Sequence, residues 1–405
     1  MTTPAIMPEL AASTAEPRPL DGPHPARRFT LDGSDELERH LARTCGKILA
    51  EVRQIVPSRR LEALVLGGGY GRGEGGVLKT AAGDRPYNDL EFYVFLRGNR
   101  FLNERRLGRM LRELGERLSP EAGLHVEFKV DSLAHLRRSP VTMFSYDLVS
   151  GHRVLAGKPG WFAGGEPHQD ADKIPLHEAT RLLMNRCSGL LFAQAKLKQD
   201  YFTAADADFV RRNLAKAQLA FGDVVLTAFG RYHWSCRERR ARLRRFSSPE
   251  TIPWLDEARR HHAAGVEFKL HPVCSAESRT QLAERHAQIT AFALVVWLWL
   301  ESRRLEQRFA SARDYALSLA NKCPGSDPWR SRLLNAKIFG PLALLRVNCH
   351  RDPRESILNA LALLLWDPER LNDEPGARVM NQLLPPLAAL QDPVAVYQSI
   401  WRKLN

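Results

Sequence analysis

The chain contains 405 residues, which is enough for about two domains with substantial cores. Its formal net charge of +13 favours an anionic ligand or partner, although charge alone does not distinguish a nucleotide, RNA and an acidic protein. The longest apolar runs, 289–300 and 357–366, are too short to span a bilayer, and the sequence shows no signal-peptide pattern. Six scattered cysteines lack C-x-x-C spacing, so we expect reduced thiols in a cytoplasmic protein without membrane contact.

The first half of the chain alternates helical and extended patterns. Residues 1–28 are rich in Pro, Ala, Ser and Thr, which predicts a mobile tail. Ser34 is a good helix N-cap, and the helix that follows it should continue to about Val56. A further helix and a short strand are expected within 141–155. Strands are expected at 61–67, 89–96 and 123–130. Helices are expected at 69–78 and at 101–117, the second of them closed by Ser119-Pro120.

The second half of the chain is predicted to be helical. A Pro/Gly-rich segment after residue 156 indicates a boundary, which divides the chain into domains at 29–160 and 175–405 with a linker at 161–174. From Leu176 onward apolar residues recur at helical spacing. Helices are expected near 276–306, 311–321, 329–348, 354–366 and 376–403.

The clearest chemical signal is a glycine-rich turn followed by two carboxylates. An apolar strand ends at Leu66 and enters the run Gly67–Glu74, and a second strand then begins with Asp89 and Glu91. Because side chains alternate along a strand, Asp89 and Glu91 should point from one face. Two neighbouring carboxylates repel each other unless a cation lies between them, and glycine-loop N–H groups bind phosphate oxygens. The pattern therefore predicts a site for a metal ion and a triphosphate.

This arrangement resembles the DNA polymerase beta superfamily of nucleotidyltransferases, in particular its minimal and aminoglycoside-adenylylating members. Gly68-Gly69 matches the family's turn, the run to Glu74 matches its Gly-Ser-x-x-Arg-Gly-Glu form with Gly69 in place of serine, and Asp89 and Glu91 match its metal-binding pair. The third carboxylate of the family has a candidate in Glu127, on the polar face of the strand at 123–130. The resemblance covers about residues 34–157. It implies an α+β fold with a small mixed sheet and flanking helices, followed by an all-α helical bundle.

The resemblance also implies a reaction and its participants. Two Mg²⁺ ions would be held by Asp89, Glu91 and Glu127, and an NMP group, AMP from ATP in the first instance, would pass to an unknown hydroxyl-bearing acceptor, with Glu127 able to take the acceptor proton. Nucleotide contacts are expected from Gly68, Gly69, Tyr70, Arg72 and Lys216. Arg186 is a further candidate for the phosphate or the acceptor, and Arg72 has an alternative pairing with Glu74. A homodimer is possible, because minimal members often dimerise.

Alternative roles for these residues remain open. The run Gly71–Gly76 fits G-x-G-x-x-G, but Gly71 comes five residues after Leu66, whereas a dinucleotide fingerprint follows its strand immediately. The glycines and carboxylates also fit a purely structural role, as a tight turn beside a solvated sheet face. Val266–Leu270 nearly repeats Val126–Val130, which makes Glu267 a distant second candidate for the third carboxylate.

Three functional classes are compatible with the sequence. The first is an enzyme that transfers a nucleoside monophosphate to a hydroxyl of a small molecule or protein. The second is an RNA-modifying or template-independent nucleotide-adding enzyme, which the arginine-rich run 237–245 favours, although a solvated helix face also accounts for that run. The third is a non-catalytic module that binds nucleotide or a partner, against which the three carboxylates argue.

Overall fold

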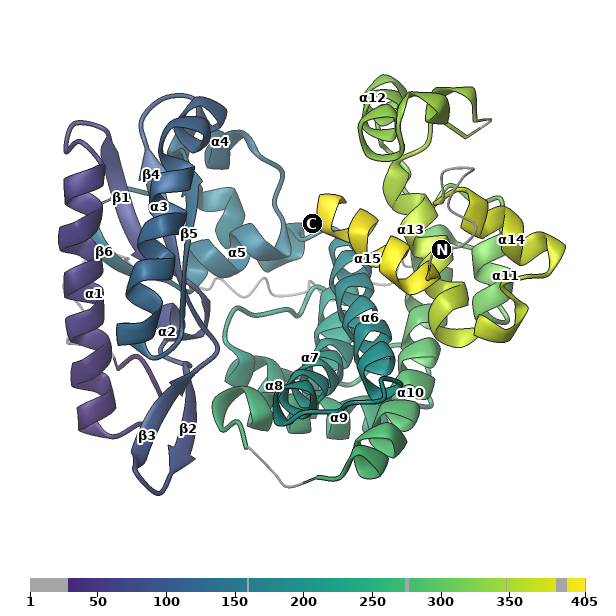
Figure 1. The fold of residues 1–405 in the computed structure, drawn as a ribbon, viewed down its shortest axis with the longest axis horizontal. Helices are drawn as coiled ribbons and strands as arrows, with labels where there is room; N and C mark the ends of the chain where they lie inside the picture. The colour runs from purple at the N-terminus through teal and green to yellow at the C-terminus, as the bar shows by residue number, and fades with distance from the viewer. Residues whose placement is uncertain (1–27, 159, 274–276, 347, 384–391, 405) are drawn as a thin grey trace, which may run out of the picture.

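The computed structural model describes residues 28–158, 160–273, 277–346, 348–383 and 392–404, and it has the α+β architecture that the sequence predicts (Figure 1). The tail predicted at 1–28 lies outside the described residues except for Arg28. A sheet half occupies the left of Figure 1, and a helical half occupies the right. Among the described residues, no helix has the length and apolar character needed to cross a membrane.

The main sheet has four strands in the order β5-β4-β1-β6. These strands are β5 (His125–Asp131), β4 (Asp89–Leu96), β1 (Leu61–Leu66) and β6 (Arg153–Gly157). β4 and β5 run parallel, whereas β1 is antiparallel to both β4 and β6, so the sheet is mixed, as expected.

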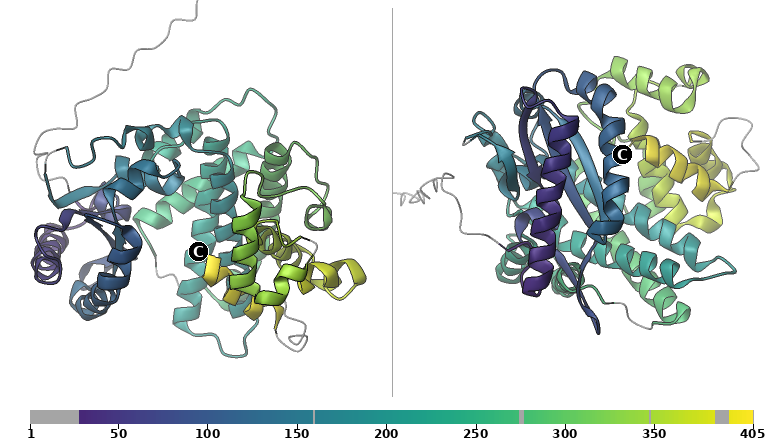
Figure 2. Two further views of the ribbon diagram at one scale, coloured as in Figure 1. Left: turned by 90° about the horizontal axis from the view of Figure 1, so that it is seen from above. Right: turned by 60° about the vertical axis from the view of Figure 1, so that its left-hand side comes forward.

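Helices cover both faces of this sheet. On one face α1 (Asp35–Ile55) and α3 (Arg100–Ala122) lie side by side (Figure 2) and bury an apolar stripe against Leu90, Phe92 and Val94 of β4. The Ser34 side chain caps α1 by accepting a hydrogen bond from the Leu37 N–H, as predicted. On the other face α4 (Leu133–Arg138) and α5 (Met143–Ser150) cover the alternate side chains of β4, which are Tyr93 and Phe95.

Two local predictions in this half are wrong. The helix expected over 69–78 is only α2 (Gly68–Arg72), because the left-handed Gly73 ends it. A two-stranded hairpin, β2 (Gly76–Thr80) and β3 (Gly83–Tyr87), follows instead. Helix α3 also continues through Pro120, because the left-handed Gly123 and not the proline ends it.

Helices dominate the second half, as predicted. Its core packs the helices His177–Leu197, Ala204–Ala228, Arg279–Leu305 and Pro353–Trp366 around the fully buried Trp297. The helix expected at 329–348 stops at the positive-φ Gly340 and gives way to a short 3₁₀ segment, and residues 384–391 of the helix expected at 376–403 lie outside the described chain. The helices are α6 (His177–Leu197), α7 (Ala204–Ala228), α8 (Cys236–Arg245), α9 (Leu255–Leu270), α10 (Arg279–Leu305), α11 (Ala312–Leu317), α12 (Pro328–Phe339), α13 (Pro353–Trp366), α14 (Glu374–Asn381) and α15 (Pro393–Leu404).

Candidate functional site

A cleft of ≈ 330 Å³ lies between the sheet half and the helical half. The glycine turn, the hairpin end and the start of β4 form one wall, and helices α6, α7 and α9 form the other. Of the predicted site residues, the cleft lining includes Gly68, Gly69, Tyr70, Arg72, Asp89, Glu91, Arg186 and Lys216. The structure therefore brings together residues that are more than a hundred positions apart in the sequence.

The glycine turn positions the backbone directly beside Glu91. Gly68 has a φ of 59°, and a Cβ added there would lie 3.3 Å from the Glu91 carboxyl group. A Cβ on Gly71 would lie only 2.0 Å from the Leu66 carbonyl oxygen, which is closer than atoms can pack. The turn therefore requires glycine at both positions, and its first N–H groups lack acceptors within α2.

A substitution at Gly71 should break this turn. We expect Gly71→Ala to lower the free energy of unfolding by about 1–3 kcal/mol or more, because β1 or α2 must move to admit the methyl group. Gly46→Ala is the matched control: Gly46 lies within α1 with nothing within 4 Å of the added Cβ, so alanine should stabilise the protein by about 0.5–1 kcal/mol. Urea denaturation measures the free energy of unfolding of both variants. Equal changes in the two would show that the turn does not require glycine at position 71.

The three predicted carboxylates lie on neighbouring strands. Asp89 and Glu91 are two positions apart on β4, and the register of the parallel pair places Glu127 directly opposite Glu91. All three side chains are half-buried, while the intervening Leu90 and Val126 point into the core. Loss of surrounding water raises the pKa of Asp89; nearby Lys216 opposes this shift, and Glu91 and Glu127 add to it.

A lysine occupies the space between two of these carboxylates. The Lys129 Nζ lies 3.1 Å from the Glu127 Oε2 and 3.8 Å from the Glu91 Oε2, and the Tyr93 hydroxyl donates to Glu91 at 2.7 Å. In the described part of the chain, no three His, Cys, Asp or Glu side chains are gathered as a metal-binding group. Asp89 and Glu91 supply the hard oxygen donors that suit Mg²⁺, whereas Glu127 would have to exchange Lys129 for the ion.

The opposite wall presents three cationic side chains to the carboxylates. They are Arg186 of α6, Lys216 of α7 and Lys269 of α9, and none of these three has an ion-pair partner within 4 Å among the described residues. A fourth cation of this wall, Arg212, is paired with Asp208 at 3.0 Å. Desolvation in the cleft, together with the Arg186 and Arg212 charges, lowers the pKa of Lys216 to about 8, although Asp89 and Glu91 act in the opposite direction. Burial also lowers the pKa of Lys269 and of Arg186. This wall therefore favours an anionic ligand.

Arg72 has a different position from the one expected. Its guanidinium donates to the carbonyl oxygens of Gly68 at 3.0 Å and Trp234 at 2.8 Å, and it lies 3.2 Å from an oxygen of Asp147. Arg72 therefore fixes the glycine turn instead of extending freely toward a phosphate. The alternative pairing with Glu74 is not formed either.

Glu74 instead joins the two halves of the molecule. Its buried carboxylate accepts hydrogen bonds from the Ser235 hydroxyl and from the backbone N–H groups of Cys236, at 2.9 Å, and Arg237, at 3.4 Å. These groups form the N-terminus of α8, where a negative charge is favourable. The contact attaches the glycine turn to the helical half.

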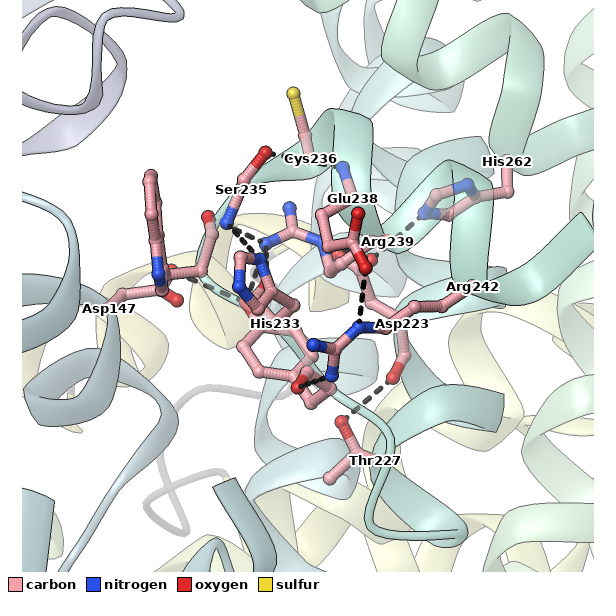
Figure 3. A network of polar contacts seen from close by, with 12 residues as sticks. Asp147, Asp223, Thr227, His233, Ser235, Cys236, Glu238, Arg239, Arg242 and His262 are labelled. Carbon is pink, nitrogen blue, oxygen red and sulfur yellow. Dashed lines mark hydrogen bonds and ion pairs between the residues drawn. The ribbon is translucent and has the colours of Figure 1, made fainter. Parts of the chain in front are cut away.

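A buried polar network continues from this junction (Figure 3). The Arg239 Nε lies 2.7 Å from the Asp223 Oδ1, and the His262 Nε2 lies 3.0 Å from the same oxygen. Arg239 also donates to the Tyr232 hydroxyl, which lies 3.3 Å from Asp147. Three of the side chains, Asp223, Arg239 and His262, are almost fully buried. The network therefore links α5, α7, α8 and α9 behind the cleft.

Several site features were absent from the sequence prediction or differ from it. Lys269 and the bond from the Tyr87 hydroxyl to Asp208, at 3.0 Å across the cleft rim, were not foreseen. The Tyr70 hydroxyl donates to the Gly76 carbonyl oxygen and accepts from the Tyr87 N–H, so this hydroxyl stabilises the hairpin instead of pointing to a ligand. Neither candidate for the third carboxylate lines the cleft: Glu127 is nevertheless the register partner of Glu91, whereas Glu267 lies on the opposite face of α9 beside Arg240 and is therefore wrong.

Comparison of the chain with models of protein families, with curated proteins and with solved structures finds no match. The functional proposal therefore depends on the chemistry and geometry of the cleft itself.

Proposed function

We propose that the protein is a nucleotidyltransferase that transfers an NMP group, AMP from ATP in the first instance, to a hydroxyl of a small molecule or protein. One observation carries the proposal: the Asp89 and Glu91 carboxylates line the cleft beside the glycine turn, opposite the cations of the helical half, and Glu127 is the register partner of Glu91 on the next strand. Asp89 and Glu91 repel each other, and a cation bound together with a triphosphate would stabilise this pair.

The proposed reaction is an in-line displacement at the α-phosphorus of the nucleotide. The acceptor oxygen forms a bond to the α-phosphorus, the bond from that phosphorus to the β-phosphate bridging oxygen breaks, and pyrophosphate leaves. In the proposal, Glu127 takes the acceptor proton. Backbone N–H groups at Gly68 and Gly69 bind the phosphate oxygens, while Lys216, Arg186 and Lys269 hold the departing charge.

Magnesium completes this proposal. Asp89 and Glu91 would hold Mg²⁺, with Glu127 as a further ligand, and bound Mg²⁺ would supply positive charge at the transferring phosphoryl group. Glu91 is held in place by the Tyr93 hydroxyl, which keeps its carboxylate beside Gly68. We also propose a cytoplasmic protein, which the free thiols of Cys45, Cys187 and Cys236 support.

The experiment is incubation of the purified protein with Mg²⁺ and each α-³²P-labelled NTP, in the presence of cell-extract metabolites, RNA or protein. Label that appears in one fraction, and only with Asp89 and Glu91 intact, would support transfer and identify the acceptor class. Label in RNA would favour the RNA-directed alternative. Nucleotide binding without any labelled product would instead favour a non-catalytic sensing module.

The pH dependence of kcat/KM for the nucleotide should follow the protonation of the Lys216 amine. With a pKa of about 8 in the free protein, Lys216 is protonated below that pH and loses its charge above it. We expect kcat/KM for the nucleotide to fall by up to about tenfold per pH unit above 8. Lys216→Arg should flatten the profile between about pH 7 and 9.5, because arginine stays protonated there. An unchanged break in this variant would assign the titration to another group.

A further inference from the structure

A second and larger concavity of ≈ 770 Å³ lies between helices α8 and α9. The cleft described above is lined by Gly265, Phe268 and Lys269 of α9, whereas this concavity is lined by Val266, Glu267 and Leu270. At 100° per residue these two sets lie on opposite faces of the helix. The α8–α9 groove is therefore a separate site, one helix diameter from the cleft.

The floor of the α8–α9 groove is aliphatic. Leu31, Ala241, Val266 and Leu270 contribute to it, and the lining has no Phe, Tyr or Trp among the residues that the structure describes. A floor of this kind accepts aliphatic side chains. Two imidazole rings also line the groove, but His262 is buried against Asp223, and His271 lies beside the carboxylates of Asp32 and Glu267, which would repel a nucleic acid.

The rim of the groove is formed by arginines. Arg237, Arg240 and Arg244 follow one face of α8 at spacings of three and four residues, and Arg260 faces them from α9. Only Arg240 has an acidic neighbour, with its Nη1 3.6 Å from Glu267; the other three have no ion-pair partner within 4 Å in the described chain.

Arg259 also lines the groove, but its guanidinium makes its contacts within the protein. It donates to the carbonyl oxygens of Leu243, at 3.1 Å, and Phe246, and it pairs with Asp256. Its contacts hold the end of α8 against α9, so the walls of the groove are fixed before any ligand arrives.

We propose that the α8–α9 groove binds an acidic, amphipathic segment of a partner protein, whose carboxylates pair with the rim arginines while its aliphatic side chains cover the floor. An acidic peptide is the occupant that complements the charge of the groove, because guanidinium groups form planar, bidentate pairs with carboxylates. The aliphatic floor also favours a peptide side chain over a nucleic-acid base. The inference does not depend on the nucleotidyltransferase proposal, because it concerns the opposite face of α9.

The test is fluorescence anisotropy with the full chain and a labelled peptide of about twelve residues that repeats Glu-Glu-Leu, a length that exceeds the span of α8. We expect saturable binding that weakens at least about tenfold in the double variant Arg240→Glu/Arg244→Glu. Arg245→Glu is the matched control, because Arg245 is an exposed residue of the same helix outside the groove lining, and it should change the Kd less than about twofold.

Two further probes separate the proposal from its competitors. A peptide of the same charge with glycine in place of leucine should bind at least about tenfold more weakly if the aliphatic floor takes part. An unlabelled oligouridine of equal charge should displace the leucine peptide poorly. Equal binding of both peptides, equal loss in the Arg245 variant, or full displacement by oligouridine would overturn the proposal, with circular dichroism confirming that each variant is folded.

Discussion

Asp89→Asn is expected to lower kcat for nucleotidyl transfer on the order of 10²–10³-fold or more while leaving the protein as stable as before, or more stable. The activity falls because the variant loses a charged oxygen donor at the proposed metal site. The stability does not fall, because burial and the neighbouring carboxylates already raise the pKa of Asp89, so its ionised form is less favourable in the folded chain than in the unfolded one. Initial rates and thermal melts of the same preparation measure both effects.

The control for this substitution is Asp131→Asn at the far end of β5. Asp131 is opposite Phe95 in the sheet register, away from the cleft, and lies 3.7 Å from the Arg100 Nε. The variant should keep its activity. If Asp89→Asn instead destabilised the protein and retained its rate, Asp89 would have a structural role, and the two-carboxylate site would not be catalytic.

Asp223→Asn is expected to have the largest effect on stability, a loss of about 3–5 kcal/mol in the free energy of unfolding. The variant removes the charge that faces Arg239 at 2.7 Å and His262 at 3.0 Å, and it leaves a buried guanidinium without its anion. The pKa of Asp223 is below its ordinary value, so its ionised form stabilises the fold at neutral pH. The difference between the variant and the wild type should begin to shrink as the pH falls below about 4, the ordinary carboxyl pKa at which the unfolded chain takes up the proton. It should be lost at the lower pH at which Asp223 is protonated in the folded chain, because the pKa of Asp223 is depressed there.

A partly exposed ion pair on α8, the helix that carries Arg239, provides the comparison. The Arg242 Nε lies 3.0 Å from the Glu238 Oε1, and both side chains are partly exposed to solvent. Glu238→Ala should therefore lower the free energy of unfolding by no more than about 1 kcal/mol. Guanidinium chloride denaturation measures the free energy of unfolding of both variants. Equal losses would show that the buried contacts of Asp223 stabilise the fold no more than a partly exposed ion pair does.

The sheet and the carboxylates were predictable because their signals are local. Alternation along β4 and β5 correctly placed Asp89, Glu91 and Glu127 on one side of the sheet. A local sequence pattern does not always determine the conformation, however, as two near-identical pentapeptides show. Val126–Val130 is an extended strand and Val266–Leu270 is the last turn of α9, so the packing of each neighbourhood, and not the five residues, decides the conformation.

The second wall of the site was harder to predict. The resemblance suggested Lys216 as a nucleotide contact, but nothing near Lys269 in the sequence indicates that α9 faces the carboxylates. The β2–β3 hairpin was missed because its strands are short and half-exposed, so its alternation is weak. The Glu74–Ser235 hydrogen bond joins residues 161 positions apart, and such pairings follow from tertiary packing alone.

That hydrogen bond has a consequence for how the chain folds. Helix α8 obtains its negatively charged N-terminal partner from the glycine turn of the sheet half, so the helical half made by itself would leave the N–H groups of Cys236 and Arg237 without their acceptor. Contacts between such distant positions also require a large loop to close before they form. The junction should therefore be completed late, after both halves have collapsed, and ribosomal synthesis must pass α8 and reach the end of α9 before the cleft can exist.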